Sequence, residues 1–248
     1  MPIFEKGLKN EKILKACGII ACFGMIAVIL ISSVDYHAFN KDYYRSEYAK
    51  LNTAEELGMS EEGLFDATFA LLDYIHLERD NIVSISEVKG QQREVFNERE
   101  TLHMKDVKDL YQNVLTARTV LLILGIVSFL FMIYSYQKQK RSWRDLLADL
   151  ATSYLQVSFC LGVLAFALIA WAVMDFTSFW IGFHQLFFTN DLWQLNPATS
   201  LMINMFPEVF FAGMVFRIII TFVLFYGSIL GIVLFYRKKR YHMLTQKN

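Results

Sequence analysis

The stretch Ile218–Tyr236 reads IIITFVLFYGSILGIVLFY and holds no charged side chain. A helix needs about 20 mainly apolar residues to cross the hydrocarbon core of a bilayer. Three further stretches have the same uncharged and apolar character, namely Ala16–Val34, Thr119–Tyr136 and Ala151–Met174. The sequence therefore predicts an all-α integral membrane protein with four transmembrane helices.

The composition of the whole chain agrees with this class. Of 248 residues, 55% are hydrophobic and 19% are charged, which excludes a disordered chain and disfavours an ordinary water-soluble domain. The formal net charge is zero, so no basic surface indicates a nucleic-acid partner. Because no Asp, Glu, Lys or Arg lies within the four stretches, an ion pump or a secondary transporter is also disfavoured. The cysteines lie in apolar runs and are expected to be small buried side chains: Cys17, Cys22 and Cys160.

Basic residues gather in three segments outside these spans. Lysines precede the first span, Lys and Arg recur between the second and third spans, and more follow the fourth span, up to Lys247. The positive-inside rule places all three segments in the cytoplasm, so both termini are expected there. The predicted order is 1–34 (N-terminus and first span), 35–118 (outer), 119–136 (second span), 137–150 (cytoplasmic), 151–174 (third span), 175–217 (outer), 218–236 (fourth span) and 237–248 (cytoplasmic tail).

The first outer segment is long and acidic. Residues 35–117 hold seventeen Asp or Glu against nine Lys or Arg. Asn97 with Glu100 three residues later resembles a capping box at the start of a helix. No Gly or Pro intervenes before Gly125, so a helix that begins near Glu98 is expected to continue into the second span. The sequence thus predicts a small helical extracellular cap in addition to the four spans.

The second outer segment, 175–217, is short and rich in aromatic residues. Aromatic rings are favoured where a membrane meets water, so we expect this segment to lie at that interface. Its large aromatic residues are Phe176, Phe179, Trp180, Phe183, Phe187, Phe188, Trp193, Phe206, Phe210 and Phe211.

One histidine lies on the predicted inner face of the first outer segment. On a helical wheel of residues 98–114, His103 falls within the apolar stripe that must pack inward. Arg99 at i−4 and Asp106 at i+3 flank it. Either Asp106 or Glu100 could orient the imidazole and set its tautomer. The alternative interpretation is a structural histidine on an apolar face.

A second histidine, His184, lies within the aromatic run Trp180–Phe188. A dense aromatic environment lowers the local dielectric constant and favours the neutral imidazole, which is the form that a general base requires. The alternative is an interfacial histidine that is bound by backbone groups. His103, Asp106 and His184 could in principle ligate a metal, but a His–Asp pair at i,i+3 is common on solvated helices, and we expect no metal. Structural or solvent-exposed roles are expected for His37, His76 and His242.

Three motifs give the chain a resemblance to a known family. Phe96–Lys108 (FNERETLHMKDVK) is similar to the pattern F-x-x-R-E-x-x-H-M-x-D-V-K of the lipoprotein intramolecular transacylases of Gram-positive bacteria. Phe183–Phe188 (FHQLFF), with Asp191–Trp193 and the stretch Asn196–Met205 after it, carries the second match. Pro207–Phe211 (PEVFF) carries the third.

The resemblance implies an acyltransferase of the bacterial cytoplasmic membrane whose active site lies at the outer face. Its substrate is a lipoprotein with a diacylglyceryl group on its N-terminal cysteine. The sn-2 acyl chain moves to the α-amino group of that cysteine, giving a lyso-form N-acyl lipoprotein. The family carries two catalytic histidines, which match His103 and His184. The resemblance implies no cofactor and no nucleic acid, and beyond substrate and membrane lipid no obligate protein partner is expected.

A mechanism follows as a hypothesis. The amine and the ester belong to one molecule, so attack closes an eight-membered ring, and a pocket that folds the substrate can supply the entropy that this costs. We assign the base role to His103, with Asp106 or Glu100 behind it, and the acid role to His184. Orienting or substrate-binding roles are expected for Arg99, Glu100, Asp106, Trp180, Phe183, Phe187, Phe188, Trp193 and Phe210.

Two other functions remain open on the residues alone. A non-enzymatic membrane module could use its acidic cap to bind a partner protein. A metal-dependent membrane lipid hydrolase would instead release the fatty acid to water.

Overall fold

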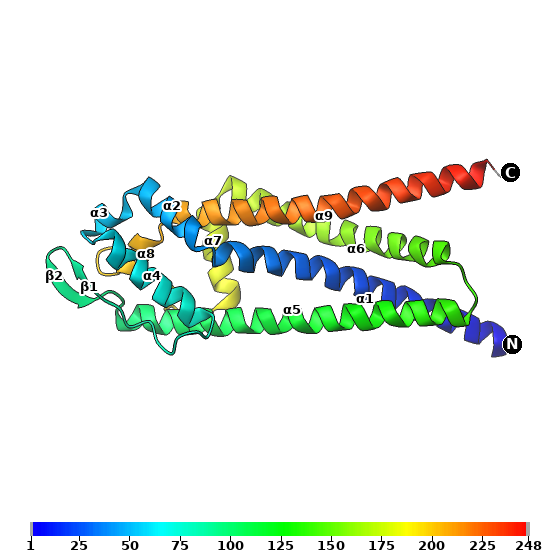
Figure 1. Ribbon diagram of the computed structural model, residues 1–248, viewed down its shortest axis with the longest axis horizontal. Helices are drawn as coiled ribbons and strands as arrows, with labels where there is room; N and C mark the ends of the chain where they lie inside the picture. Colours follow the sequence, from blue (N-terminus) through cyan, green and yellow to red (C-terminus); the bar gives the residue numbers. More distant parts are fainter. Residues whose placement is uncertain (1, 247–248) are drawn as a thin grey trace. The chain divides into compact units, whose positions relative to one another are not determined.

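Four long helices dominate the computed structural model, which describes residues 2–246 (Figure 1). They are α1 (Pro2–Ala38), α5 (Glu98–Lys138), α6 (Trp143–Met174) and α9 (Glu208–Thr245). Each is long and apolar enough to cross a membrane, which confirms the four predicted spans. Lys247, one of the residues behind the predicted topology, lies outside the described residues.

The chain divides into two compact units, and all four long helices contribute to both. The bundle unit comprises the chain up to Ser33, the segment Thr116–Ile169 and the chain from Ile219 onward. The second unit comprises Val34–Leu115 and Ala170–Ile218, and we call it the histidine unit because His103 and His184 both belong to it.

Small residues and internal hydrogen bonds hold the bundle unit together. α1 approaches α5 so closely that a Cβ atom on Gly24 would lie 2.7 Å from the Leu121 carbonyl oxygen. The Tyr154 hydroxyl on α6 donates to the Tyr226 carbonyl on α9 at 3.1 Å. The four helices line an apolar cavity of about 640 Å³ that is partly open to the outside. Its lining includes Met25, Val28, Ile126, Leu150 and Val233.

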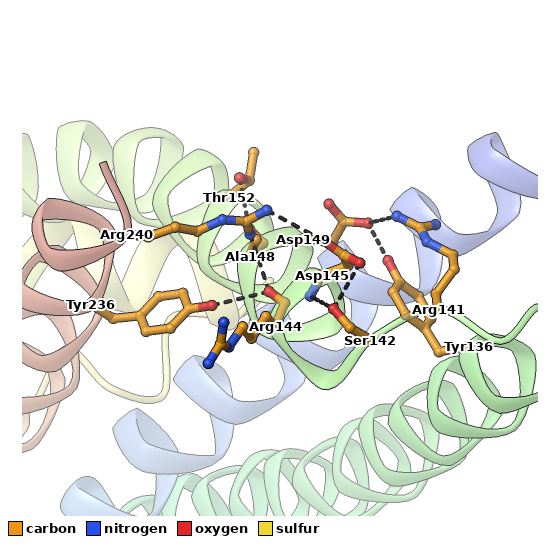
Figure 2. A network of polar contacts seen from close by, with 10 residues as sticks. All are labelled: Tyr136, Arg141, Ser142, Arg144, Asp145, Ala148, Asp149, Thr152, Tyr236 and Arg240. Carbon is orange, nitrogen blue, oxygen red and sulfur yellow. Dashed lines mark hydrogen bonds and ion pairs between the residues drawn. The ribbon is translucent and has the colours of Figure 1, made fainter. Parts of the chain in front are cut away.

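One end of the bundle unit gathers the three segments that carry the basic residues. Figure 2 shows Arg240 on α9 bound to the Arg144 carbonyl (3.1 Å) and to the Asp145 carboxylate (3.4 Å) at the start of α6. Tyr136 near the end of α5 donates to Asp149 on α6. Leu14 on α1 packs in the same buried cluster as Tyr136. The N-terminal, central and C-terminal basic segments therefore meet at one end of the bundle unit.

Besides parts of the four long helices, the histidine unit contains short helices and strands. They are α2 (Lys41–Leu51), α3 (Thr53–Leu57), α4 (Glu61–Ile75), β1 (Ile85–Val88), β2 (Gln91–Glu94), α7 (Phe176–Phe187) and α8 (Leu201–Met205). Their core is rich in aromatic and sulfur-containing residues, including Tyr43, Tyr44, Tyr48, Met205, Phe206 and Phe210.

The hairpin β1–β2 is absent from the sequence-based prediction, which treats the first outer segment as helical. The two strands pair antiparallel from Ile85 opposite Glu94 to Val88 opposite Gln91. Lys89 and Gly90 join them with φ of 53° and 81°. Positive φ at both central residues suits a tight hairpin turn, so Lys89 and Gly90 reverse the chain here.

The close approach of α1 and α5 predicts an asymmetry between two glycines. Gly24→Ala places a methyl group against the Leu121 backbone, which cannot move without shifting α5. We expect the free energy of unfolding to fall by about 1–3 kcal/mol, which is the usual cost of overpacking, and the thermal unfolding temperature in detergent to fall with it. Gly162→Ala is the control, because no atom lies within 4 Å of its added Cβ. Equal unfolding temperatures for the two variants would contradict the helix packing described here.

Candidate active site

The two histidines singled out by the sequence lie together in the histidine unit. His103 comes from α5 and His184 from α7, and their ring centroids are 6.0 Å apart. Each side chain is only 7% exposed. The pair therefore forms a buried cluster of two imidazoles from segments that lie far apart in the sequence.

The start of α5 is fixed by the predicted capping box, which the structure confirms. The Glu100 N–H donates to Asn97 Oδ1 at 3.0 Å, and the Asn97 N–H donates to Glu100 Oε2 at 2.6 Å. Each side chain thus satisfies a backbone donor that the first turn of a helix leaves free. His103 follows one turn later, so this cap sets its position along the helix.

Glu100 also reaches across the histidine unit to α8. Its Oε1 accepts the Ser200 hydroxyl and, at 2.8 Å, the Met202 N–H. The side chain is fully buried, and a buried carboxylate is tolerated because its lone pairs are filled. Within the described chain Glu100 makes no hydrogen bond to His103, so its effect on the imidazole comes through the backbone of α5.

α7 presents His184 in a defined tautomer. Asp175 caps the start of the helix, and its Oδ1 accepts the Ser178 N–H at 2.9 Å. One helical turn before His184, the Trp180 carbonyl lies 2.8 Å from its Nδ1. A carbonyl oxygen only accepts hydrogen bonds, so Nδ1 carries the proton and Nε2 keeps a free lone pair.

Aromatic rings surround the pair. Trp193 stacks on His184 with centroids 5.0 Å apart, and Trp180 meets the same imidazole edge-on at 4.8 Å. Phe188 lies 5.4 Å from His103 and 5.7 Å from His184. Phe183 also contacts His184, at 5.6 Å.

Two other predicted aromatic residues lie elsewhere. Phe187 packs on Phe183, with centroids 4.8 Å apart. Phe210 belongs to the core, where it contacts Tyr43 and its carbonyl accepts the Tyr43 hydroxyl at 2.6 Å. Neither has a ring contact with His103 or His184 among the residues described.

Arg99 and Asp106 bind the loop that follows α7. Arg99 donates to the Asp191 carbonyl and lies 3.4 Å from its carboxylate. Asp106 Oδ2 accepts the Asn190 side-chain amide at 2.8 Å. Sequence reasoning missed Asn190, because a single polar residue in a loop gives no sign of its partner on a distant helix.

Burial keeps both imidazoles neutral near pH 7. His103 precedes the apolar part of α5, which begins at Thr119. Burial lowers the pKa of His103 to about 4, and the nearby His184 adds to the effect. Burial also lowers the pKa of His184, against the opposing influence of its bond to the Trp180 carbonyl. His103 Nδ1 is buried and has no hydrogen-bond partner in the described part of the chain, so the structure leaves one polar atom of the pair unused.

The bonds of Glu100 predict a large effect of its removal. Glu100→Ala leaves the Asn97 N–H, the Met202 N–H and the Ser200 hydroxyl without their acceptor. An unsatisfied buried donor costs about 1–3 kcal/mol. We therefore expect the free energy of unfolding, measured by thermal unfolding of the purified protein, to fall by about 3 kcal/mol or more. The control is Glu98→Ala, an exposed acid in the same helical turn. A stability loss no larger than that of the control would show that the carboxylate does not join α5 to α8.

Comparison with known proteins identifies solved structures of similar fold. A search of curated protein sequences finds no match. Solved structures of the membrane-integral lipoprotein intramolecular transacylase Lit from Bacillus cereus are similar in fold. One has a TM-score of 0.67 at 16% identity, and the alignment covers 96% of this chain and 98% of that one. A variant with a histidine replaced by arginine gives 0.70 at 15% identity over 96% and 98% of the two chains.

The sequence also matches the family model described as lipoprotein intramolecular transacylase Lit, over residues 19–211. The match includes His103, His184 and the short helices and strands of the histidine unit, and of α9 it covers only Glu208–Phe211. Since it covers more than half of the chain, the protein belongs to the Lit family of lipoprotein intramolecular transacylases.

Proposed function

We propose that this protein moves the sn-2 acyl chain of a lipoprotein's diacylglyceryl group to the α-amino group of its N-terminal cysteine, which leaves a lyso-form N-acyl lipoprotein. Membership of the Lit family supports an acyltransferase that acts on lipoproteins. The observation that carries the finer proposal is the buried contact between His103 and His184 inside a shell of aromatic rings.

In the proposed reaction the amine nitrogen attacks the sn-2 ester carbonyl of the same molecule and closes an eight-membered ring. A new N–C bond forms, the bond between the acyl carbon and the sn-2 oxygen breaks, and the proton lost by the amine ends on the released sn-2 hydroxyl. Because the acyl group never leaves the substrate, this balance calls for no ATP, coenzyme A or metal.

The hydrogen bonds favour roles that differ from those expected from the sequence. His184, with its Nδ1 proton held by the Trp180 carbonyl, offers Nε2 as the base and can return the proton to the leaving alkoxide. The pKa of His103 is lowered to about 4, although the charge of Asp106 opposes the shift, and His103 Nδ1 has no hydrogen bond to a carboxylate in the described chain, which makes this histidine a weak base. We assign it to donate a hydrogen bond, as a neutral imidazole, to the oxyanion of the tetrahedral intermediate.

The aromatic shell supports the intramolecular course of the reaction. Trp193, Phe188 and Trp180 leave the imidazoles little contact with water, which would otherwise compete with the amine for the ester. Holding amine and ester in a near-attack arrangement can contribute about 7–11 kcal/mol. Confinement of the substrate therefore contributes more to the proposed rate than activation of the nucleophile does.

The proposal places the site at the outer face of the bacterial cytoplasmic membrane, with both termini in the cytoplasm and membrane lipid around the bundle unit. The meeting of the basic segments at one end of the bundle unit supports this orientation. The substrate supports it as well, because a lipoprotein has a free α-amino group only outside, after removal of its signal peptide.

Fragmentation mass spectrometry of a diacylglyceryl lipopeptide tests the function. Intact mass does not change in an intramolecular transfer, so the expected sign is an N-acyl-cysteine fragment together with loss of amine reactivity. His103→Ala and His184→Ala should each lower the rate by about 10²–10⁴-fold. His242→Ala, in the exposed tail, should leave it unchanged. Released fatty acid would point to a hydrolase, and an unaltered lipopeptide to a non-enzymatic membrane module.

The lowered pKa values predict the pH dependence. A base must be neutral, so protonation of His184 lowers the rate only as the pH falls below the ordinary histidine value of about 6.5. The substrate amine has a pKa of about 7.7–8.0, so the rate should rise with pH up to about 8 and then level off. The measurement is kcat/KM against pH, and a profile that is flat between pH 6 and 8 would contradict it.

A further inference from the structure

The histidine pair is covered by a segment without regular structure. Residues 189–195, which we call the strap, lie between α7 and α8 and form neither helix nor strand. His103 and His184 are each 7% exposed, so a lipid-modified cysteine cannot reach them in this arrangement. Some part of the cover must move before the proposed reaction can begin.

Two contacts hold the strap to α5, one on either side of His103. Arg99, four residues before it, binds the Asp191 carbonyl and carboxylate. Asp106, three residues after it, accepts the Asn190 amide at 2.8 Å. Positions i−4 and i+3 lie on the same helix face as His103, so the strap is bound to that face of α5 on both sides of the imidazole.

Asn190 links these contacts to the ring that covers the second histidine. Its Oδ1 accepts the Leu192 N–H at 3.0 Å, which folds the strap into a tight turn. Its carbonyl accepts the Trp193 indole N–H, also at 3.0 Å. Trp193, held in this way, stacks on His184. One asparagine therefore ties Asp106 on α5 to the indole over His184.

The contacts that close the strap are the weakest part of the cover. The Arg99 and Asp191 side chains are 43% and 74% exposed, and ion pairs in contact with water add little stability. The other walls are α5 and α7, which are regular α-helices. Opening the strap thus disturbs fewer buried bonds than moving either helix.

We propose that the strap is a gate for the substrate and that Asn190 is the positioning residue that couples its closure to the placement of Trp193 over His184. This inference rests on the proposed function, since the molecule admitted is the diacylglyceryl-cysteine end of a lipoprotein. When the gate is open the cysteine amine and glyceryl ester enter. When it is closed Trp193 and Phe188 hold them against the imidazoles and keep water out.

A reversible cross-link tests whether the strap must open. In a background with Cys17, Cys22 and Cys160 replaced by Ala, Asp106→Cys and Asn190→Cys are joined by a short bis-methanethiosulfonate reagent. The same protein sample is assayed before linking, after linking and after reduction, so any effect of the substitutions cancels. We expect linking to abolish conversion of the lipopeptide and reduction to restore it. Each single cysteine variant, treated with the same reagent, controls for simple modification.

Histidine modification gives a second readout that does not depend on activity. Diethyl pyrocarbonate reacts with accessible imidazoles, and peptide mass spectrometry separates His103 and His184 from the exposed reference His242. Asn190→Ala should raise the labelling of both buried histidines by about fivefold or more, the change that follows the loss of a contact of ordinary strength. Asp109→Asn, on the exposed side of α5, should not.

The outcomes separate the gate from the proposed function. A linked protein that still converts the lipopeptide, or unchanged labelling in Asn190→Ala, overturns the gate and leaves the transacylase intact. Failure of the wild-type protein to form the N-acyl product overturns the function itself. Asn190→Ala should also raise KM more than it lowers kcat if the closed strap mainly holds the substrate, whereas a change in folding alone would lower the amount of active protein and leave KM as it is.

Discussion

The buried carboxylate of Glu100 is the interaction on which the histidine unit depends. One oxygen closes the cap of α5, and the other accepts Ser200 and Met202 at the start of α8. A charge withdrawn from water is stable only while these donors stay in place. Glu100 thereby fixes two segments that lie about a hundred residues apart in the sequence. The first segment, the start of α5, carries His103. The second, the start of α8, follows the connection that contains the strap.

Local features of this arrangement could be predicted from the sequence. The four spans follow from uncharged runs of sufficient length, and the capping box at Asn97 and Glu100 follows from residue types three positions apart. Contacts between distant segments could not. The amide of Asn190 on Asp106, the placement of Phe210 in the core and the short hairpin that ends at Glu94 all depend on which surfaces meet after folding. Periodicity identifies an inward face, and it does not identify what that face contacts.

Burial has a different chemical effect on the two imidazoles because their partners differ. His184 has a backbone carbonyl that fixes its proton, so desolvation leaves it a directed lone pair. His103 has an unused nitrogen and a pKa lowered to about 4, which favours a neutral donor over a proton acceptor. In the proposed reaction this division lets the two histidines act without a hydrogen bond from either ring to a carboxylate.

The two contacts of the strap place unequal constraints on the evolution of the chain. Arg99 is bound partly through a backbone carbonyl, which every amino acid supplies, so position 191 can vary while half of that contact survives. The contact of Asp106 with Asn190 uses a side chain at both ends, so a change at one position calls for a matching change at the other. Among related sequences, residues 106 and 190 should therefore co-vary, and the residue at position 191 should vary independently of them.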